Sequence, residues 1–256
     1  LYFASPDKLD PNLPFVNREV RQAMNLAINR KSIADNILGG KVQPVRVNGY
    51  HHELEEKLWP GVWNPDWDRR FDDLYGYNPT KAKELLKQAG YPNGFELTIY
   101  IYAVAGLPEG IDIGQAMDLD FRAVGLRPKL VEVDYSVVRG KFQKREMHGA
   151  IWGNLPGFRS LQHINVFHKV DGGLVHSYEH PFIEQKVAEL GRVVDPVQRA
   201  RLLRDVGDHK FFEFADIPMF WLFADAALNP KFIAEYVFPG TIIGSYSHLE
   251  YVKLAQ

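Results

Sequence analysis

The chain has 256 residues, 46% of them hydrophobic, and its 30 basic and 32 acidic side chains give a formal charge of -2. This apolar content suffices for a substantial core in one large domain or two smaller ones, while the near-neutral charge gives no electrostatic reason to expect nucleic acid as a partner. The lack of cysteine excludes disulfides and thiolate metal sites, and no apolar run approaches the ~20 residues of a membrane helix.

Two long stretches, 41–77 and 153–180, show no regular hydrophobic period. The first is rich in proline, glycine and aromatic residues. Long ordered loops of this kind are either functional or wrapped over the core. Within the first stretch, we expect the charge runs 53–57 and 66–73 to form solvated faces or surface ion pairs.

Residues 78–103 specify a capped helix, a turn and a strand. Asn78 suits the N-cap and Pro79 the first helical position. An apolar stripe then recurs at helical spacing until Gly90 stops the helix: Ala82, Leu85, Leu86 and Ala89. From Phe95 apolar residues alternate with others, which predicts a strand over 95–103.

Strands and helices continue to alternate along the chain. The pattern predicts a helix at 110–124, a strand at 126–133, a helix at 135–145 and a strand at 147–152. Pro181 and Gly191 bracket a further helix, and Asp195 with Gln198 forms a capping box for the next one. On that last helix we expect four residues to face inward: Val197, Ala200, Leu203 and Val206. A buried strand at 217–223 follows, and the whole order predicts an α/β fold with covered sheet faces.

One short motif points to metal chemistry. Residues 176–180 read His-Ser-Tyr-Glu-His, the H-x-x-E-H pattern of inverted zinc peptidases, which places its two histidines one helical turn apart. Pro181 follows at once and fits the first position of a new helix, so both histidines belong to the preceding loop. We therefore expect no metal site here. A metal-dependent α/β hydrolase that uses the loop from His163 to His180 remains the alternative function.

The other candidate catalytic groups are weaker. The run from His51 to Glu53, and the pair His163 and His168, are interpreted as ordinary surface or hydrogen-bonded side chains. Ser160 near His163 does not define a triad, because closeness in sequence does not establish reach. The chain contains neither a nucleophile elbow nor a phosphate loop. No cofactor is expected, and an enzyme is the less favoured class.

Three segments resemble, in order and spacing, the family 5 extracellular solute-binding proteins, a bacterial group that serves peptide, nickel and related ABC importers. Residues 78–100 (NPTKAKELLKQAGYPNGFELTIY) are similar to the helix-turn-strand signature of that family. Residues 14–17 (PFVN) with 20–40 (VRQAMNLAINRKSIADNILGG) are similar to an earlier block of the family. Residues 195–199 (DPVQR) and 215–219 (ADIPM) are similar to its ending.

This resemblance implies an α/β lobe of the periplasmic-binding-protein type (type II-like), with a mixed sheet flanked by helices. Because the chain corresponds to the C-terminal half of such proteins, we expect an incomplete two-lobe architecture. Residues 1–14 would be a strand of the first lobe, 15–222 the second, ligand-binding lobe, and 223–256 a return segment to the first lobe. Most of the first lobe is expected to lie outside this chain.

The resemblance also implies where a ligand would bind. In many members one strand ends in W-x-x-D, with the tryptophan against the ligand and the aspartate pairing with the α-amino group of a peptide. Here Trp152 is present, but the third position after it is Leu155 and the adjacent Asn154 carries no charge. We hypothesise a ligand without a free α-ammonium at that position, with Trp152 as a stacking wall and Asn154 as a neutral hydrogen-bonding group.

Three further residues are candidates for ligand contact. Arg159 would suit an anionic group if its side chain points into the cleft. Tyr102 and Phe158 are predicted to lie at a strand end and in an adjoining loop, where α/β sheets commonly present ligands.

The function that the resemblance implies is transport without chemistry. A small solute, peptide-like or other, would be captured between two lobes and delivered to the membrane subunits of an ABC permease. The expected partners are the solute, the permease and the absent N-terminal lobe, in the periplasm or outside the cell, with a lipid anchor on the absent N-terminus as an option. As a third alternative, the isolated half would be an interaction module that uses the surface left open by the absent lobe.

Overall fold

A computed structural model of the chain describes residues 2–3, 12–104, 106–147, 149–153, 159–169, 173, 175–223, 227–237 and 251–255. The strands are β1 (Tyr2–Phe3), β2 (Val42–Pro44), β3 (Glu96–Ile101), β4 (Arg127–Glu132), β5 (Ala150–Trp152), β6 (Phe220–Leu222), β7 (Ile233–Tyr236) and β8 (Val252–Leu254). A 3-10 turn, η1 (Pro14–Val16), precedes the helices α1 (Arg18–Ala27), α2 (Arg30–Asn36), α3 (His52–Leu58), α4 (Pro65–Arg69), α5 (Phe71–Tyr75), α6 (Pro79–Gln88), α7 (Gly110–Ala123), α8 (Tyr135–Gln143), α9 (Ser160–Phe167), α10 (Pro181–Leu190) and α11 (Pro196–Phe212).

A four-stranded mixed sheet forms the centre of the fold. Its order is β1-β5-β3-β4; β3 runs parallel to both β4 and β5, and β1 is antiparallel to β5. In β3 every second side chain enters the core, with Leu97, Ile99 and Ile101 all buried. This confirms the predicted α/β class, the mixed sheet and the flanking helices. The same pairing places Tyr2 and Phe3 in this sheet, opposite Trp152 and Ile151.

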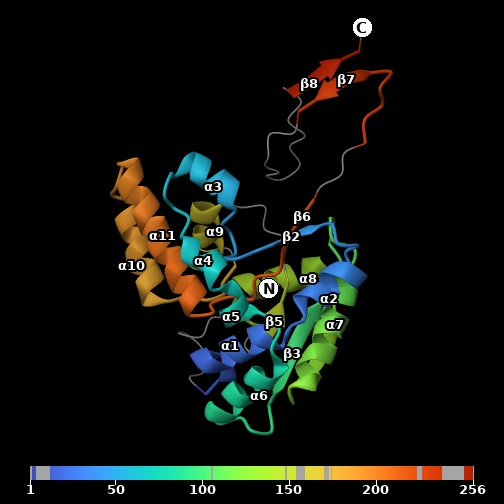
Figure 1. The fold of residues 1–256 in the computed structure, drawn as a ribbon, viewed down its shortest axis with the longest axis vertical. Helices are drawn as coiled ribbons and strands as arrows, with labels where there is room; N and C mark the ends of the chain where they lie inside the picture. The colour runs from blue at the N-terminus through green and yellow to red at the C-terminus, as the bar shows by residue number, and fades with distance from the viewer. Residues whose placement is uncertain are drawn as a thin grey trace.

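Helices cover the sheet and build a second core beside it. One buried cluster joins α1, α6 and α7 to β3. A second cluster joins α4, α5, α10 and α11 and has Trp67 at its centre, with no exposed surface. Figure 1 shows α10 and α11 side by side, on the opposite side of the molecule from α2 and α7. These two clusters are the main apolar centres of the lobe, and a smaller third cluster, which joins Val138 and Phe142 of α8 to Ala150 of β5, also packs on the four-stranded sheet.

Most predicted elements are confirmed within a few residues, and the largest differences lie in the two aperiodic stretches. Residues 41–77 contain β2, α3, α4 and α5, and residues 153–180 contain α9. The prediction that these two stretches lack regular structure is therefore wrong for these elements. The predicted strand at 217–223 is shortened to β6 and is half-buried. Val197 is wrong as an inward-facing residue, because its side chain is 57% exposed, whereas Ala200, Leu203 and Val206 are buried as predicted.

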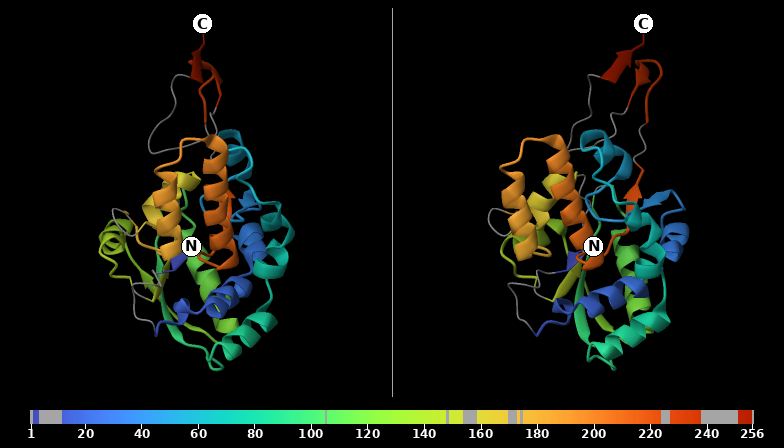
Figure 2. Two further views of the ribbon diagram at one scale, coloured as in Figure 1. Left: turned by 90° about the vertical axis from the view of Figure 1, so that its left-hand side faces the viewer. Right: turned by 60° about the vertical axis from the view of Figure 1, so that its left-hand side comes forward.

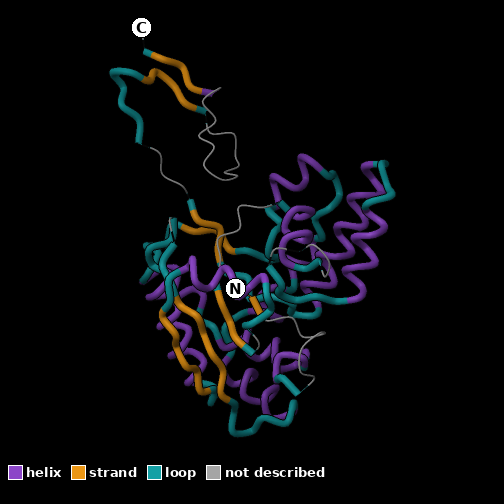
Figure 3. Tube along the Cα trace, turned by 180° about the vertical axis from the view of Figure 1, so that it is seen from behind, coloured by secondary structure: helices purple, strands orange, loops and turns teal. Residues whose placement is uncertain are grey.

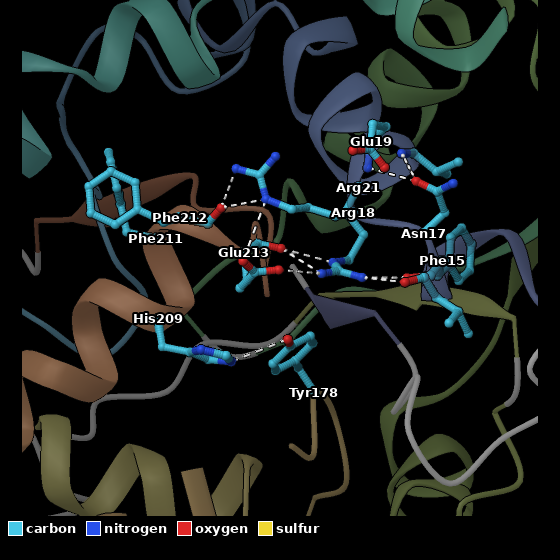
Figure 4. Close-up of polar contacts among 12 residues, drawn as sticks. Phe15, Asn17, Arg18, Glu19, Arg21, Tyr178, His209, Phe211, Phe212 and Glu213 are labelled. Carbon is cyan, nitrogen blue, oxygen red and sulfur yellow. Dashed lines mark hydrogen bonds and ion pairs between the residues drawn. The ribbon is translucent and has the colours of Figure 1, made fainter. Parts of the chain in front are cut away.

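Two arginines of α1 connect the two apolar centres (Figure 4). The Arg21 guanidinium is buried and donates to the carbonyl oxygens of Phe15, Val16 and Glu213 at 2.7–3.0 Å. Arg18 donates to the carbonyl of Phe212 at 2.6 Å. Two of these carbonyls lie at the end of η1 and two at the end of α11. Carbonyl groups at the end of a helix have no amide of the same helix to accept from, so the arginines supply the missing donors. One buried side chain thus fixes the start of α1 against the end of α11.

The C-terminal strands β7 and β8 form an antiparallel hairpin that extends away from the lobe (Figures 2 and 3). Its backbone is closed by the bond from the Ala255 amide to the Phe232 carbonyl at 2.9 Å. Two of its large apolar residues are strongly exposed, Phe232 at 66% and Leu254 at 75%. Among the residues described, no helix combines the length and apolar character needed to cross a bilayer.

Candidate ligand-binding surface

The carboxyl ends of the parallel strands β3 and β5 meet at one edge of the sheet, which is where open α/β sheets commonly bind ligands. Tyr102 directly follows β3, and Gly153 directly follows β5. The Tyr102 hydroxyl donates a hydrogen bond to the Gly153 carbonyl, and the ring is 6% exposed. Burial raises the pKa of the Tyr102 hydroxyl, with a smaller contribution from Tyr135, so Tyr102 is a neutral donor at physiological pH. The bond holds the two strand ends together.

A small apolar cavity of about 100 Å³ lies at this edge. Its walls come from the end of β3, the beginning of α7, β6 and α2: Leu38, Ile99, Tyr100, Ile101, Tyr102, Val104, Leu107, Gly110, Ile113, Gly114, Met117, Gly153, Met219, Phe220 and Leu222. Sites for small ligands usually measure ~300–1,000 Å³. The cavity is therefore too small to enclose a solute by itself and would serve as one wall of a larger site.

Glycines allow α7 to approach the strand end so closely. A Cβ atom on Gly114 would lie 2.2 Å from Cγ2 of Ile101, and one on Gly110 would lie 2.3 Å from the carbonyl oxygen of Tyr102. No side chain fits at either position without moving its neighbour. The first turn of α7 is thereby placed directly beside the carboxyl end of β3.

A larger groove, about 470 Å³, lies between α3 and α9, and we call it the α3–α9 groove. It is lined by Leu58, Trp59, Arg159, Leu161, Gln162, Asn165 and Val166. The two helices are joined by Glu55, which is fully buried and accepts hydrogen bonds from the Ser160 amide, at 3.0 Å, and from the Ser160 hydroxyl. Burial raises the pKa of Glu55, and the bonds from Ser160 oppose this shift. Glu55 satisfies the first free amide of α9 in the manner of a cap.

The predicted ligand residues are distributed over these features as follows. Tyr102 lines the cavity at the sheet edge, and Arg159 lines the α3–α9 groove. The backbone of Trp152 pairs with Tyr2 and Tyr100 in the sheet. Asn154 and Phe158 lie outside the described residues.

The two histidines of the H-x-x-E-H motif make different contacts in the structure. His176 contacts Glu179, which also pairs with Arg145 at 2.7 Å, while His180 caps α10 by accepting from the Phe182 amide at 3.2 Å. Among the described residues, no three His, Cys, Asp or Glu side chains gather closely enough to hold a metal ion. Ser160 donates to Glu55 rather than to His163. The hydrolase alternative therefore finds no support in this loop.

A buried polar cluster around Lys210 lies between α9 and the end of α11, and no local sequence pattern indicates it. Lys210 Nζ donates to the Asn48 carbonyl at 2.8 Å and lies 3.1 Å from Oδ2 of Asp216. At this distance the Lys210 ammonium balances the charge of the Asp216 carboxylate as an ion pair. Burial lowers the pKa of Lys210, and Asp216 opposes this shift. His168 lies beside the pair, with Nε2 at 3.8 Å from Asp216.

We expect the stability of this cluster to depend on pH through His168. Burial, assisted by the charge of Lys210, lowers the pKa of His168 from 6.5 to about 3. Below pH 6.5 His168 binds a proton in the unfolded chain but stays neutral in the folded protein. The free energy of unfolding therefore decreases as pH falls from 6.5 toward 3. Each pH unit in this window removes up to about 1.4 kcal/mol for this one histidine, or about 2 kcal/mol by pH ~5. Urea denaturation at several pH values measures the slope.

The matched variant is His168→Asn. The carbonyl of Tyr178, 2.9 Å from His168 Nδ1, accepts the ring proton, and the asparagine amide can replace that donor without titrating. The variant should therefore lose less stability on acidification than the parent chain. An equal acid slope in both proteins would contradict the assignment to His168.

Sequence reasoning missed Glu55 for an identifiable reason, whereas no local pattern indicated the buried pair of Lys210 and Asp216. Glu55 belongs to the charge run 53–57, which we predicted to be a solvated face, and that prediction is wrong for Glu55. Its position one helical turn before Trp59 is the only local hint of an inward direction. His163 and His168 are fully buried rather than at the surface, although both are hydrogen-bonded.

Comparisons with known proteins identify the relatives of this lobe. Residues 2–163 match the sequence model of the "Bacterial extracellular solute-binding proteins, family 5 Middle". Heme-binding protein A of Haemophilus influenzae is 30% identical over 142 residues, which is 55% of this chain and 24% of that protein.

Solved structures share the fold at low sequence identity. The oligopeptide-binding protein AppA from Bacillus subtilis, solved with a nonapeptide, superposes with a TM-score of 0.70 at 17% identity, over 96% of this chain and 49% of that chain. The ABC transporter-associated periplasmic binding protein DppA from Helicobacter pylori, solved with the peptide STSA, gives a TM-score of 0.65 at 21% identity, over 86% and 40%. The chain thus spans less than half the length of each of these three proteins.

Proposed function

Because the chain belongs to family 5 of the bacterial extracellular solute-binding proteins, we propose that it forms one lobe of a two-lobed protein that captures a small solute for an ABC importer. Proteins of this family are transport components without enzymatic activity and work outside the cytoplasm. In this proposal residues 15–222 are the ligand-binding lobe. The segment 223–256 returns to the other lobe, in agreement with the exposed apolar residues on the β7–β8 hairpin.

The observation that carries this proposal is the family match across residues 2–163, which includes the sheet edge where Tyr102 and Gly153 meet. The cavity there is about 100 Å³, so a solute would need a second wall from another lobe. Closure of two lobes on the solute would supply that wall, and the differential contacts of the closed state would provide the binding energy.

A thermal-shift screen of the two-lobed protein tests the proposal. Peptides, sugars, opines and organic anions are offered singly, and the solute that raises Tm is then examined by small-angle X-ray scattering. We expect that solute to reduce the radius of gyration and to be recovered unchanged after incubation. A protein that converts its solute chemically, or that binds none of these classes, would contradict a transport function.

The proposed ligand contacts are Trp152, Asn154, Tyr102, Phe158 and Arg159, and they lead to a prediction about peptides. Leu155 stands where many family members place the aspartate that pairs with an α-ammonium group. An unpaired buried ammonium costs about 3–5 kcal/mol, so free-amine peptides should bind at least ~100-fold more weakly than their N-acetylated forms. Isothermal titration of the two-lobed protein with both forms measures the ratio.

The variant Leu155→Asp is the matched control for that experiment. It restores a carboxylate at this position and should reverse the preference in favour of free-amine peptides. Micromolar or tighter binding of free-amine di- and tripeptides by the unaltered protein would show that the ammonium finds another partner, and the prediction would be wrong.

A further inference from the structure

The α3–α9 groove combines apolar walls with a single charged side chain. Leu58, Trp59, Leu161 and Val166 supply apolar surface, Gln162 and Asn165 supply amide groups, and Arg159 is the charged residue among those lining the groove. Its volume of about 470 Å³ falls within the usual range of small-ligand sites. Arg159 is the N-cap residue of α9, the helix that comes after β5 in the chain.

Arg159 keeps its donors available. Within the described part of the chain, no hydrogen bond or ion pair engages its guanidinium, although it lies close enough to Glu55 to lower the pKa of that carboxyl group. The two oxygens of Glu55 accept from the amide and the hydroxyl of Ser160, so its interaction with Arg159 is electrostatic and involves no hydrogen bond. Arg159 is therefore a half-buried arginine that lies near one buried carboxyl group but whose guanidinium has no hydrogen-bond acceptor among the described residues.

The walls of the groove are held in place before any ligand arrives. The Trp59 amide donates to the Glu55 carbonyl at 2.7 Å, which closes the last turn of α3. The Arg199 guanidinium stacks over the Trp59 ring in a cation–π contact, with 5.1 Å between the guanidinium carbon and the ring centroid. Arg199 is itself fixed by bonds to the carbonyls of Leu190 and Val193 at 2.9 and 2.7 Å. The tryptophan therefore forms a rigid wall, which lowers the entropic cost of binding against it.

We propose that the α3–α9 groove binds the carboxylate of a small organic acid that has an apolar or aromatic body. Arg159 would engage the carboxylate, and Trp59 and Leu58 would cover the body. Arginine matches a carboxylate with two parallel hydrogen bonds and remains charged at all physiological pH values. The inference rests on the proposed function, because it names the class of solute that this lobe would help to capture.

The test is isothermal titration of the 256-residue chain with 3-phenylpropionate and with its neutral isostere, 3-phenylpropionamide. We expect the carboxylate to bind at least ~10-fold more tightly than the amide, since a charged pair of this kind contributes on the order of a decade of affinity or more. The difference should shrink as salt is added, because the groove is open to solvent.

Three variants assign the effect to Arg159. Arg159→Gln should bring the carboxylate to the affinity of the amide and leave the amide unchanged. Arg139→Gln, at an exposed arginine of α8 outside the groove, should keep the full preference. Arg159→Lys retains the positive charge but cannot form two parallel hydrogen bonds to a carboxylate, so it should give an intermediate preference for the carboxylate over the amide. Circular dichroism and Tm of each variant confirm that the lobe remains folded.

The inference is overturned if the amide binds as well as the carboxylate, if neither binds, or if Arg159→Gln preserves the preference in a folded protein. The solute screen of the two-lobed protein is independent of these results. If a solute closes the two lobes but 3-phenylpropionate does not bind in the groove, only this inference is overturned. Failure of every solute in the screen overturns the transport function itself.

Discussion

Replacing Arg21 with alanine is expected to lower the free energy of unfolding by about 3–5 kcal/mol, which is a large part of the stability of a typical domain. The guanidinium is 3% exposed and serves the carbonyls of Phe15, Val16 and Glu213. Its removal leaves buried acceptors without donors, each of which costs about 1–3 kcal/mol, and opens a cavity between the two apolar centres. Urea denaturation followed by circular dichroism measures the loss.

Arg18→Ala provides the comparison for this experiment. Arg18 lies on the same helix and also donates to the end of α11, but its side chain is 38% exposed, so water can replace it. A cost of about 1 kcal/mol is expected for this variant. If Arg21→Ala cost no more than Arg18→Ala, the buried clamp would not be the connection that the structure indicates.

Replacing Gly94 with alanine is expected to destabilise the lobe by about 3 kcal/mol. Gly94 has φ +64° in the turn between α6 and β3, and a Cβ atom there would lie 1.9 Å from the carbonyl oxygen of Gly125. That oxygen belongs to the backbone of the turn before β4, so neither turn can yield without disturbing the β3–β4 pairing. The thermal unfolding midpoint and urea titration report the change.

Gly90→Ala separates steric overlap from backbone strain. Gly90 also has a positive φ, +92°, but a Cβ atom at this position meets nothing within 4 Å. Only the left-handed conformation then penalises alanine, at about 1–2 kcal/mol. Equal effects of the two substitutions would show that the contact with Gly125 is relieved without cost.

The sequence predicts this fold best where local and tertiary signals agree. The Asn78 cap, the apolar stripe of α6 and the alternation in β3 are each produced by a few adjacent residues, and all three are confirmed. α9 was missed because its buried face combines Ser160 and His163 with Ile164 and Phe167, so polar residues interrupt the apolar period. Their partners are distant in sequence, because Ser160 donates to Glu55, 105 positions away, and Nδ1 of His163 lies 3.4 Å from Lys210 Nζ.

The candidate site was predictable only in part, for the same reason. Tyr102 could be placed at a strand end from alternation, and the structure places it there, but its bond to Gly153 depends on the β3–β5 pairing. Arg159 could be named as a cation, yet the groove that surrounds it is formed by α3, a helix hidden in an aperiodic stretch. The assignment of all five residues to ligand contact stays a prediction.

The sheet order has a consequence for how copies of this chain behave toward one another. β4 is an outer strand, and such strands invite aggregation through their unpaired amides and carbonyls. Because the Arg127 amide points inward to the Phe95 carbonyl, the next residue, Pro128, directs its backbone outward; it has no amide proton, and its carbonyl already accepts from Arg122 at 2.8 Å. With Arg127 and Lys129 exposed on either side, this rim offers little to an incoming strand. Pro128 therefore limits edge-to-edge pairing of copies of this chain at this point of β4.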